Sequence, residues 1–246
     1  MNIILIVLLV LCSLLLFIFL IRKKPYTAIV TSGLSNRLRT ILPLHHLNNK
    51  INVWWSKDRE CNGHFLEAFQ PIENINFISF VNAIPPDFIG QKTFDKIIGH
   101  NDPELEKQCY SLLKLKPDIQ DTVDTFIKDH NIINGIALHV RRTDFVKDVT
   151  KVGLYKEDSD YYKYIDSFPM NTPVFLATDN SKTQKQYMDR YPNIVVHKII
   201  NSTGKMRQTS FVDSVIDVFI CSKANEFMGT PYSSYSGLIE ILRQIY

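Results

Sequence analysis

Short apolar blocks, each followed by residues with helical spacing, run through the chain after a long apolar segment at its amino terminus. In the first half, strands are predicted at residues 26–32, 51–55 and 74–80. Helices are predicted at residues 37–47 and in the segments that begin at Pro103 and Pro117. Proline supports the last two because its fixed φ suits the first helical position.

The second half repeats this alternation. Strands are predicted at residues 136–140, 174–178, 194–196 and 226–228, and helices at residues 161–168, 182–191, 211–222 and 234–245. Because strands alternate with helices, the fold class is α/β with mainly parallel sheets. A boundary near residues 131–135 divides the chain into two small Rossmann-like halves, 26–132 and 133–246, which we expect to face each other across a cleft.

The amino-terminal segment from Ile3 to Ile21 carries no charge. At about 1.5 Å per residue, a helix of this length comes close to the roughly 30 Å of one hydrocarbon core. A cleaved signal peptide has a shorter apolar region and a small-residue cleavage site, and neither is present here. The sequence therefore predicts a single transmembrane anchor at residues 3–21.

The side of the membrane is predicted from the flanking charges. Basic residues 22–24 follow the anchor, and positive charge favours the cytosolic side over the Golgi lumen. Cys61, Cys109 and Cys221 cannot all pair with one another, which agrees with a reducing compartment. The Asn-Ser-Thr triplet at residues 201–203 is a possible N-glycosylation site, which favours the lumenal side instead. We expect the globular part to lie in the cytosol.

The net charge and the spacing of possible metal ligands argue against two classes of function, nucleic-acid binding and metal binding. The net charge is +3 and no long basic run is present, so the chain is not expected to bind nucleic acid through a basic tail. His45, His46 and His64 lack ligand spacing, and no metal site is predicted. The triplet Asp158–Asp160 has the form of a DxD metal–nucleotide motif, but a helical pattern follows it, which favours a role in capping.

The segment IALHVRRTDF, residues 136–145, ends an apolar strand with two adjacent arginines. Open α/β sheets present ligand-binding groups at the carboxyl ends of strands, and guanidinium groups bind phosphate bidentately. We therefore expect Arg141 and Arg142 to lie at a phosphate site with His139 beside them. The alternative is that Arg142 pairs with Asp144, or that both arginines are solvated.

Three further segments place polar groups where a ligand can reach them. Asp179 and Asn180 follow a strand and either cap the next helix or form a wall of the same crevice. Ser233 and Ser234 begin a helix and suit either a phosphate seat or ordinary capping. Asp217 is flanked by apolar residues and either accepts from a nucleotide base or ribose or is a helix-surface acid.

In their order and spacing, the segments HVRRTD, VFLATDN, DSVIDVFICSKANEFMGTPYSS and GLSNRLRT resemble the superfamily of α1,2-, α1,6- and protein O-fucosyltransferases, from residue 31 to residue 242. They are most similar to the group of the N-glycan core α1,6-fucosyltransferase and the nodulation-factor fucosyltransferase. The resemblance implies a two-domain GT-B fold, GDP-fucose as donor, a glycan or glycoconjugate acceptor, no metal cofactor and inversion at the anomeric carbon of fucose.

The resemblance also implies roles for single residues. Arg141 falls on the family's essential arginine, which contacts the GDP phosphates, and His139 on a donor-site histidine. Asp217 falls on the acid that contacts the nucleoside, and Ser233 and Ser234 fall on serines near the phosphates.

Two stretches match the superfamily less closely. Asp179 matches the second motif, whereas Asn180 stands where the core enzyme has a second acid. Gly33, Asn36 and Arg37 resemble the amino-terminal loop of the wider superfamily, where G-x-x-N-R/Q is common, and are expected on the donor side.

Three alternatives are kept open by the sequence. The same fold can use another nucleotide-sugar. The chain can be an inactive, membrane-anchored protein that binds a sugar or a nucleotide. It can also be a structural membrane protein with only the fold in common.

Overall fold

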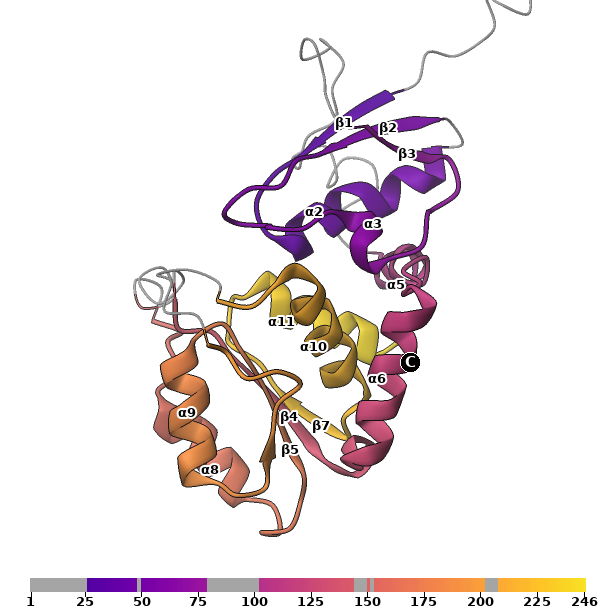
Figure 1. Ribbon diagram of the computed structural model, residues 1–246. Coiled ribbons are helices and arrows are strands. Elements are labelled where there is room, and N and C mark those ends of the chain that lie inside the picture. The colour runs from indigo at the N-terminus through magenta and orange to yellow at the C-terminus, as the bar shows by residue number, and fades with distance from the viewer. Residues whose placement is uncertain (1–25, 48–49, 79–101, 144–149, 151–152, 202–207) are drawn as a thin grey trace, which may run out of the picture.

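A computed structural model describes residues 26–47, 50–78, 102–143, 150, 153–201 and 208–246. Its helices and strands form two parallel sheets with helices packed on them (Figure 1). Within these ranges no helix is both long and apolar enough to cross a bilayer. The predicted anchor at residues 3–21 lies outside the described residues.

The first sheet has three parallel strands in the order β1-β2-β3, with bounds Tyr26–Val30, Ile51–Trp55 and Ile75–Ile78. On β2, alternate residues are buried, so one face of the strand looks toward the core. Helix α2, Leu34–Ile41, and the short helix α3, Phe65–Ala68, contribute to the same buried core.

The helix predicted at residues 37–47 differs from the observed one at both ends. It begins at Leu34, and it continues beyond Ile41 as a 3-10 helix from Leu42 to Leu47. Pro43 explains the change, because proline has no N–H to donate to the carbonyl four residues before it. The α-helical hydrogen bonding therefore cannot continue through this position.

The second sheet has four parallel strands in the order β6-β5-β4-β7, with bounds Ile194–Val195, Val174–Thr178, Ile136–Val140 and Glu226–Met228. Every residue of β4 and β5 is buried. Their unbroken apolar sequences follow from this position, since strands in the middle of a parallel sheet are covered on both faces.

Two sets of helices cover this second sheet (Figure 1). Helices α8 and α9, Asp158–Asp166 and Ser181–Arg190, pack on one face, where Tyr161 and Tyr187 join the buried cluster with Leu138 and Leu176. Helices α6, α10 and α11, Pro117–Asp129, Phe211–Lys223 and Ser234–Arg243, belong to the core on the other side, with Phe175. Helix α5, Pro103–Tyr110, joins that core through Cys109 and Tyr110.

Helix α8 begins three residues before the predicted helix at residues 161–168. Glu157 and Asp160 form a reciprocal capping box at its start. The DxD-like triplet at residues 158–160 is thus part of a helix start, which confirms its predicted role in capping.

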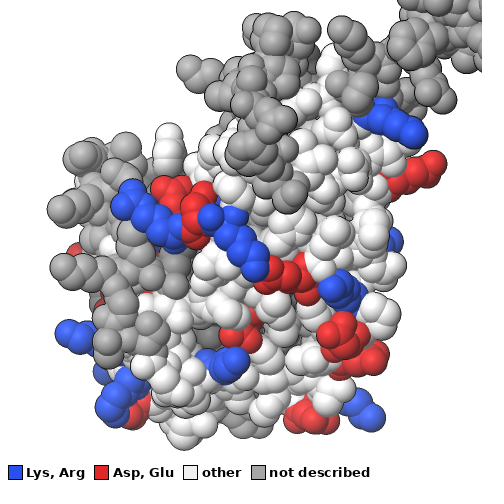
Figure 2. Space-filling view, turned by 45° about the horizontal axis from the view of Figure 1, so that its top comes forward, with Lys and Arg blue, Asp and Glu red and all other residues white. Residues whose placement is uncertain are grey.

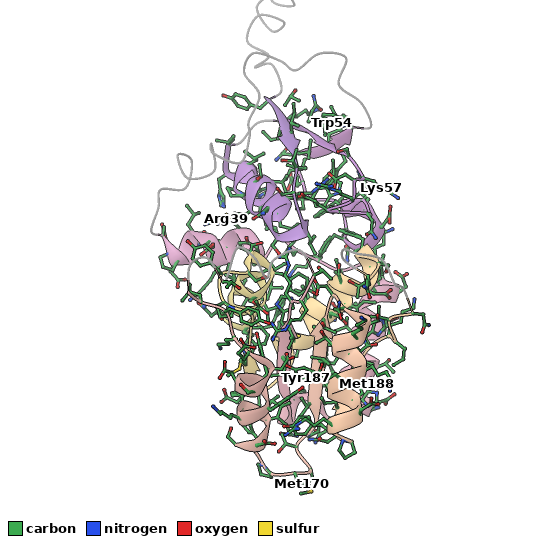
Figure 3. The ribbon with its side chains drawn as sticks, turned by 90° about the vertical axis from the view of Figure 1, so that its left-hand side faces the viewer. Arg39, Trp54, Lys57, Met170, Tyr187 and Met188 are labelled. Carbon is green, nitrogen blue, oxygen red and sulfur yellow. The ribbon has the colours of Figure 1, made fainter. Side chains whose placement is uncertain are left out.

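One buried core continues from the first sheet into the second half, and α10 and α11 lie between the two sheets (Figure 1). Helix α11 contacts α2, and α10 contacts both α3 and α6. Helix α6 belongs to the first half by the predicted boundary, yet it packs against α10 of the second half. Trp54 and Met170 mark opposite ends of the molecule, and Arg39 on α2 lies between them (Figure 3).

Gly63 is one of the closest contacts between the halves. A Cβ atom built at Gly63 would lie 2.3 Å from the Cβ atom of Phe211, at the start of α10. We predict that Gly63→Ala lowers the free energy of unfolding by about 1–3 kcal/mol, because the added methyl group forces α10 away. Chemical denaturation followed by tryptophan fluorescence measures the change.

Gly237→Ala in α11 is the matched control. A Cβ atom there meets no atom within 4 Å, so alanine should raise the stability by about 0.5–1 kcal/mol through its better helix propensity. A Gly63→Ala variant as stable as the wild type would contradict the close packing of the two halves.

Candidate active site

A cavity of about 480 Å³ opens between the two halves. Its lining comes from the carboxyl ends of β1, β4 and β5, from the loop after β2, and from the first turns of α2, α10 and α11. In the second sheet, the chain runs outward from β4 to β6 and then returns to the other side of β4 as β7. The cavity therefore lies at a topological switch point, the usual ligand position in open α/β sheets.

Thr230, in the segment after β7, is hydrogen-bonded to the end of β4 at this switch point. Its hydroxyl donates to the carbonyl of His139 at 2.8 Å and accepts from the backbone N–H of Arg141 at 2.9 Å. The Tyr161 hydroxyl lies 3.2 Å from the same oxygen. Thr230 is buried and fixes the end of β4, the segment from which Arg141 projects. Sequence reasoning missed this residue, because the contact joins positions far apart in the chain.

Arg141 lines the cavity, as the sequence predicts. Its side chain is 14% exposed, and its Nε atom lies 3.9 Å from Oδ2 of Asp179. Asp179 also accepts from the backbone N–H of Arg142 at 2.9 Å and from the hydroxyl of Thr143. One carboxylate thus contacts three consecutive residues after β4, which fixes the path of the loop that carries Arg141.

Asn180, next to Asp179, has a different position. Its side chain accepts from the backbone N–H of Thr183 at 3.0 Å and caps α9. The sequence allowed this pair either to cap the helix or to form a wall of the crevice. Asp179 lines the cavity, and Asn180 caps the helix.

Arg142 does not line the cavity. Its guanidinium group pairs with Asp158 at 2.7 Å, donates to the carbonyl of Lys156 at 3.0 Å and lies over the rings of Tyr155 and Tyr161. Its partner among the described residues is Asp158 of α8, and Asp144, the partner in the alternative drawn from the sequence, lies outside the described residues. These contacts tie the loop after β4 to α8 instead of leaving the group available to a ligand.

His139 and Asp217 line the cavity and are both deeply buried. Burial, with a smaller effect from Arg141, lowers the pKa of His139 to about 3, so its ring is neutral at neutral pH. Nδ1 of His139 lies 2.8 Å from the hydroxyl of Ser236, and the ring packs on Tyr235 at a centroid distance of 4.5 Å. Burial, and to a lesser extent Asp213, raises the pKa of Asp217 well above its usual value.

Three helices, α2, α10 and α11, begin at the cavity, and Ser210 caps α10 with its side chain. The other two, α2 and α11, come from opposite halves. Helix α11 begins after Ser233, and Ser234 lines the cavity, whereas Ser233 lines a neighbouring groove. Helix α2 begins after Gly33, and Gly33, Ser35 and Asn36 line the cavity. Neither helix has a side-chain hydrogen bond at its cap. Free backbone N–H groups at helix starts attract anions, so the cavity is suited to a phosphate-bearing ligand.

The starts of α2 and α11 each have a buried serine hydroxyl, on Ser35 and Ser233. Within the described part of the chain, they and the Tyr164 hydroxyl are the buried side-chain oxygens without a hydrogen-bond partner. A buried polar group without a partner is costly, so the hydroxyl of Ser35, which lines the cavity, is consistent with an anion site there, whereas that of Ser233 belongs to the neighbouring groove.

Arg37 is fully buried and does not line the cavity, unlike Gly33 and Asn36. Its guanidinium group donates to the carbonyls of Ser32 and Ser56 and pairs with Asp58. These bonds connect the loops after β1 and β2, which form the wall of the cavity in the first half. Arg37 therefore shapes the site from behind.

Several cavity residues were not predicted from the sequence: Arg39, Arg59, Asn62, Tyr232 and Tyr235. Arg39 lies three residues after Asn36 on α2, and this helical spacing was the available signal for it. The arginines add positive charge to the first-half wall. On the face shown in Figure 2, Lys and Arg are interspersed with Asp and Glu, so no single broad basic surface covers that face.

Comparisons with solved structures identify the fold. A crystal structure of the NodZ α1,6-fucosyltransferase soaked with GDP-fucose has a TM-score of 0.60 at 14% identity, covering 89% of this chain and 93% of that chain. NodZ from Bradyrhizobium gives a TM-score of 0.60 at 13% identity, covering 89% and 94% of the two chains. POFUT1 in complex with GDP gives 0.56 at 11% identity, covering 89% and 94%. The two sheets are thus arranged as in fucosyltransferase structures of the GT-B type.

No curated protein matches the chain in sequence. A family model does match, over residues 24–246, which include both sheets and all the residues that line the cavity. The chain belongs to the family of GDP-fucose protein O-fucosyltransferases, and it is a glycosyltransferase.

Proposed function

We propose that the chain is a metal-independent, inverting glycosyltransferase that moves fucose from GDP-fucose to a glycan acceptor. The observation that carries this proposal is the position of Arg141. Its side chain lines a cavity at the switch point of the second sheet, into which the starts of α2 and α11 open from opposite halves. GDP and GDP-fucose are bound to structurally similar proteins, which supports the same class of donor here.

Arg141 is the proposed catalytic residue. As the bond between fucose C1 and the β-phosphate oxygen breaks, the electron pair leaves with GDP and negative charge grows on that phosphate. Fixed positive groups that face this charge lower the barrier. Arg141 and the start of α11 at Ser234 supply them, and the start of α2 at Gly33 and Asn36 lies across the cavity. Because a guanidinium group is always charged, these groups take the place of a divalent ion.

Attack by an acceptor hydroxyl on the face of C1 opposite to GDP inverts the anomeric carbon. The displacement is loose, with oxocarbenium character at C1, so most of the charge to be stabilised is on the leaving group. We assign Asp179 to positioning Arg141, because its oxygens accept from Arg142 and Thr143. The proton of the attacking hydroxyl passes to a general base, for which Asp144 and Asp179 are the candidates.

His139 and Asp217 are the proposed nucleoside contacts, since they lie in the same cavity and carry a ring and a carboxylate that complement a purine. The cytosolic placement and the membrane anchor at residues 3–21 also belong to this proposal. Protease protection of intact membranes tests both, because a cytosolic catalytic part is digested from outside sealed vesicles.

The donor class is tested with the full chain in detergent. We expect GDP to raise the melting temperature more than UDP or ADP at equal concentration, because a ligand that binds the folded state stabilises it by mass action. Labelled GDP-fucose with a panel of glycans should give transfer that survives EDTA. Preference for UDP or ADP would indicate another nucleotide-sugar, GDP binding without transfer or hydrolysis an inactive binder, and no nucleotide binding a structural protein.

Arg141→Ala should lower the transfer rate by about 10²- to 10³-fold or more, because a fixed charge at the leaving phosphate is lost. Its melting temperature should stay close to that of the wild type. Arg142→Ala is the matched comparison. It removes the cationic partner of Asp158 and should lower the free energy of unfolding by about 1–3 kcal/mol. Full transfer activity in Arg141→Ala would overturn the proposed catalytic role.

Asp217→Asn tests whether the carboxylate reads the guanine base. Ionised Asp217 can accept from guanine N1–H and the 2-amino group, whereas an asparagine amide accepts one proton and donates another, which matches xanthine. We predict that Asp217→Asn weakens GDP binding and strengthens xanthosine diphosphate binding, each by about 10-fold. Equal weakening of both ligands in calorimetry would place Asp217 on the ribose instead.

Asp217→Asn also tests whether GDP binding depends on pH through Asp217. Because burial raises the pKa of Asp217, the carboxylate is protonated at pH values where an exposed aspartate is ionised. GDP binding through the ionised form therefore weakens as pH falls through this raised pKa and levels off above it. Asp217→Asn should remove the dependence.

A further inference from the structure

Tyr232 combines three features that the proposed donor chemistry does not explain. Its backbone φ is +62°, the residue is 74% exposed, and it lines the donor cavity. The φ value lies in the left-handed region, which residues with a Cβ atom rarely adopt.

The local turn explains the backbone conformation but not the choice of residue. Pro231 occupies the second position of a turn that is closed by a 3.4 Å bond from the N–H of Ser233 to the carbonyl of Thr230. With proline second and a positive φ third, this is the arrangement of a type II turn, in which glycine or asparagine fits the third position best. Tyrosine is strained there, which points to a use for its side chain.

A groove adjoins the donor cavity at this residue. It has a volume of about 450 Å³ and lies at the carboxyl end of β7 and along α11. Tyr232 is the described residue that lines both the cavity and this β7 groove. Tyr232 therefore stands at the boundary between the two spaces.

The chemistry of the β7 groove fits a neutral sugar. Lys156 and Glu240 provide a cation and a carboxylate along its wall, and together they can donate to and accept from sugar hydroxyls. A pyranose ring has C–H groups on its faces and hydroxyls at its edge. An exposed aromatic ring flanked by a few polar side chains is complementary to both.

We propose that Tyr232 is a stacking platform for a sugar ring of the acceptor, and that the β7 groove holds the adjoining part of that glycan. This inference rests on the proposed function, because it takes the cavity beside Arg141 as the donor site. The reacting hydroxyl then lies in the cavity near Arg141, while the rest of the oligosaccharide leads away across Tyr232. Ser234, which follows closely in the chain, stays with the donor phosphates.

The test compares glycan binding and nucleotide binding in the same proteins. The full chain in detergent is applied to an array of neutral, sialylated and sulfated oligosaccharides, with and without GDP, and GDP affinity is measured by calorimetry. Tyr232→Ala should weaken binding to the glycans that the wild type recognises at least 10-fold and leave GDP affinity within about 2-fold. Tyr232→Phe should keep glycan binding, because it keeps the ring.

Two further variants test whether glycan binding is lost because the ring is lost or because the turn changes. Tyr232→Gly relieves the positive φ, so it should raise the melting temperature and still lose glycan binding as Tyr232→Ala does. Tyr26→Ala is the matched control, since Tyr26 is a 41% exposed tyrosine on β1 that lines neither space.

The outcomes distinguish this inference from the proposed function. It is overturned if the wild type binds no glycan on the array, if Tyr232→Ala binds glycans as the wild type does, or if Tyr232→Ala loses GDP and glycan affinity together. The last result would make Tyr232 a nucleotide contact. Glycan binding that depends on Tyr232 in a chain that does not bind GDP would support the platform and refute the donor.

Discussion

Parallel strands impose one constraint on which the whole site depends: the carboxyl end of each strand lies at the same edge of its sheet, where the following helix begins. In this protein, the corresponding edges of both sheets open onto one cavity. The uncapped starts of α2 and α11 and the arginine after β4 therefore face the same volume. Their positive ends come from the backbone and need no particular side chain, which fits the absence of side-chain caps at Gly33 and Ser233.

Burial gives the cavity a second property. His139 is kept neutral and the carboxyl of Asp217 is protonated more readily than an exposed one, whereas a guanidinium group such as that of Arg141 stays charged in any surroundings. Before a ligand enters, positive charge is thus concentrated on the side where phosphates are expected. The side expected to hold the nucleoside is closer to neutral, and hydrogen-bond direction can select the base there.

The sequence predicted the parts of this arrangement that depend on local pattern. The strands β4 and β5 were recognisable because strands covered on both faces have uninterrupted apolar sequences, and Arg141 was recognisable because it follows such a strand. Errors at helix ends also had local causes, as at Pro43, whose missing N–H interrupts the α-helical bonding. Long-range partners could not be predicted in this way. Asp158 is the partner of Arg142 and Asp58 is the partner of Arg37, and no spacing rule links either pair.

The continuous core has a consequence for how such enzymes diversify. Helix α11 contacts α2, α10 contacts α3 and α6, and apolar residues of both halves share one buried cluster. A recombination event that exchanged one sheet and its loops would separate residues that pack closely against each other, as Gly63 and Phe211 do. If Tyr232 is the acceptor platform proposed above, new acceptor preferences are more accessible through substitutions in its exposed turn than through the shuffling of halves.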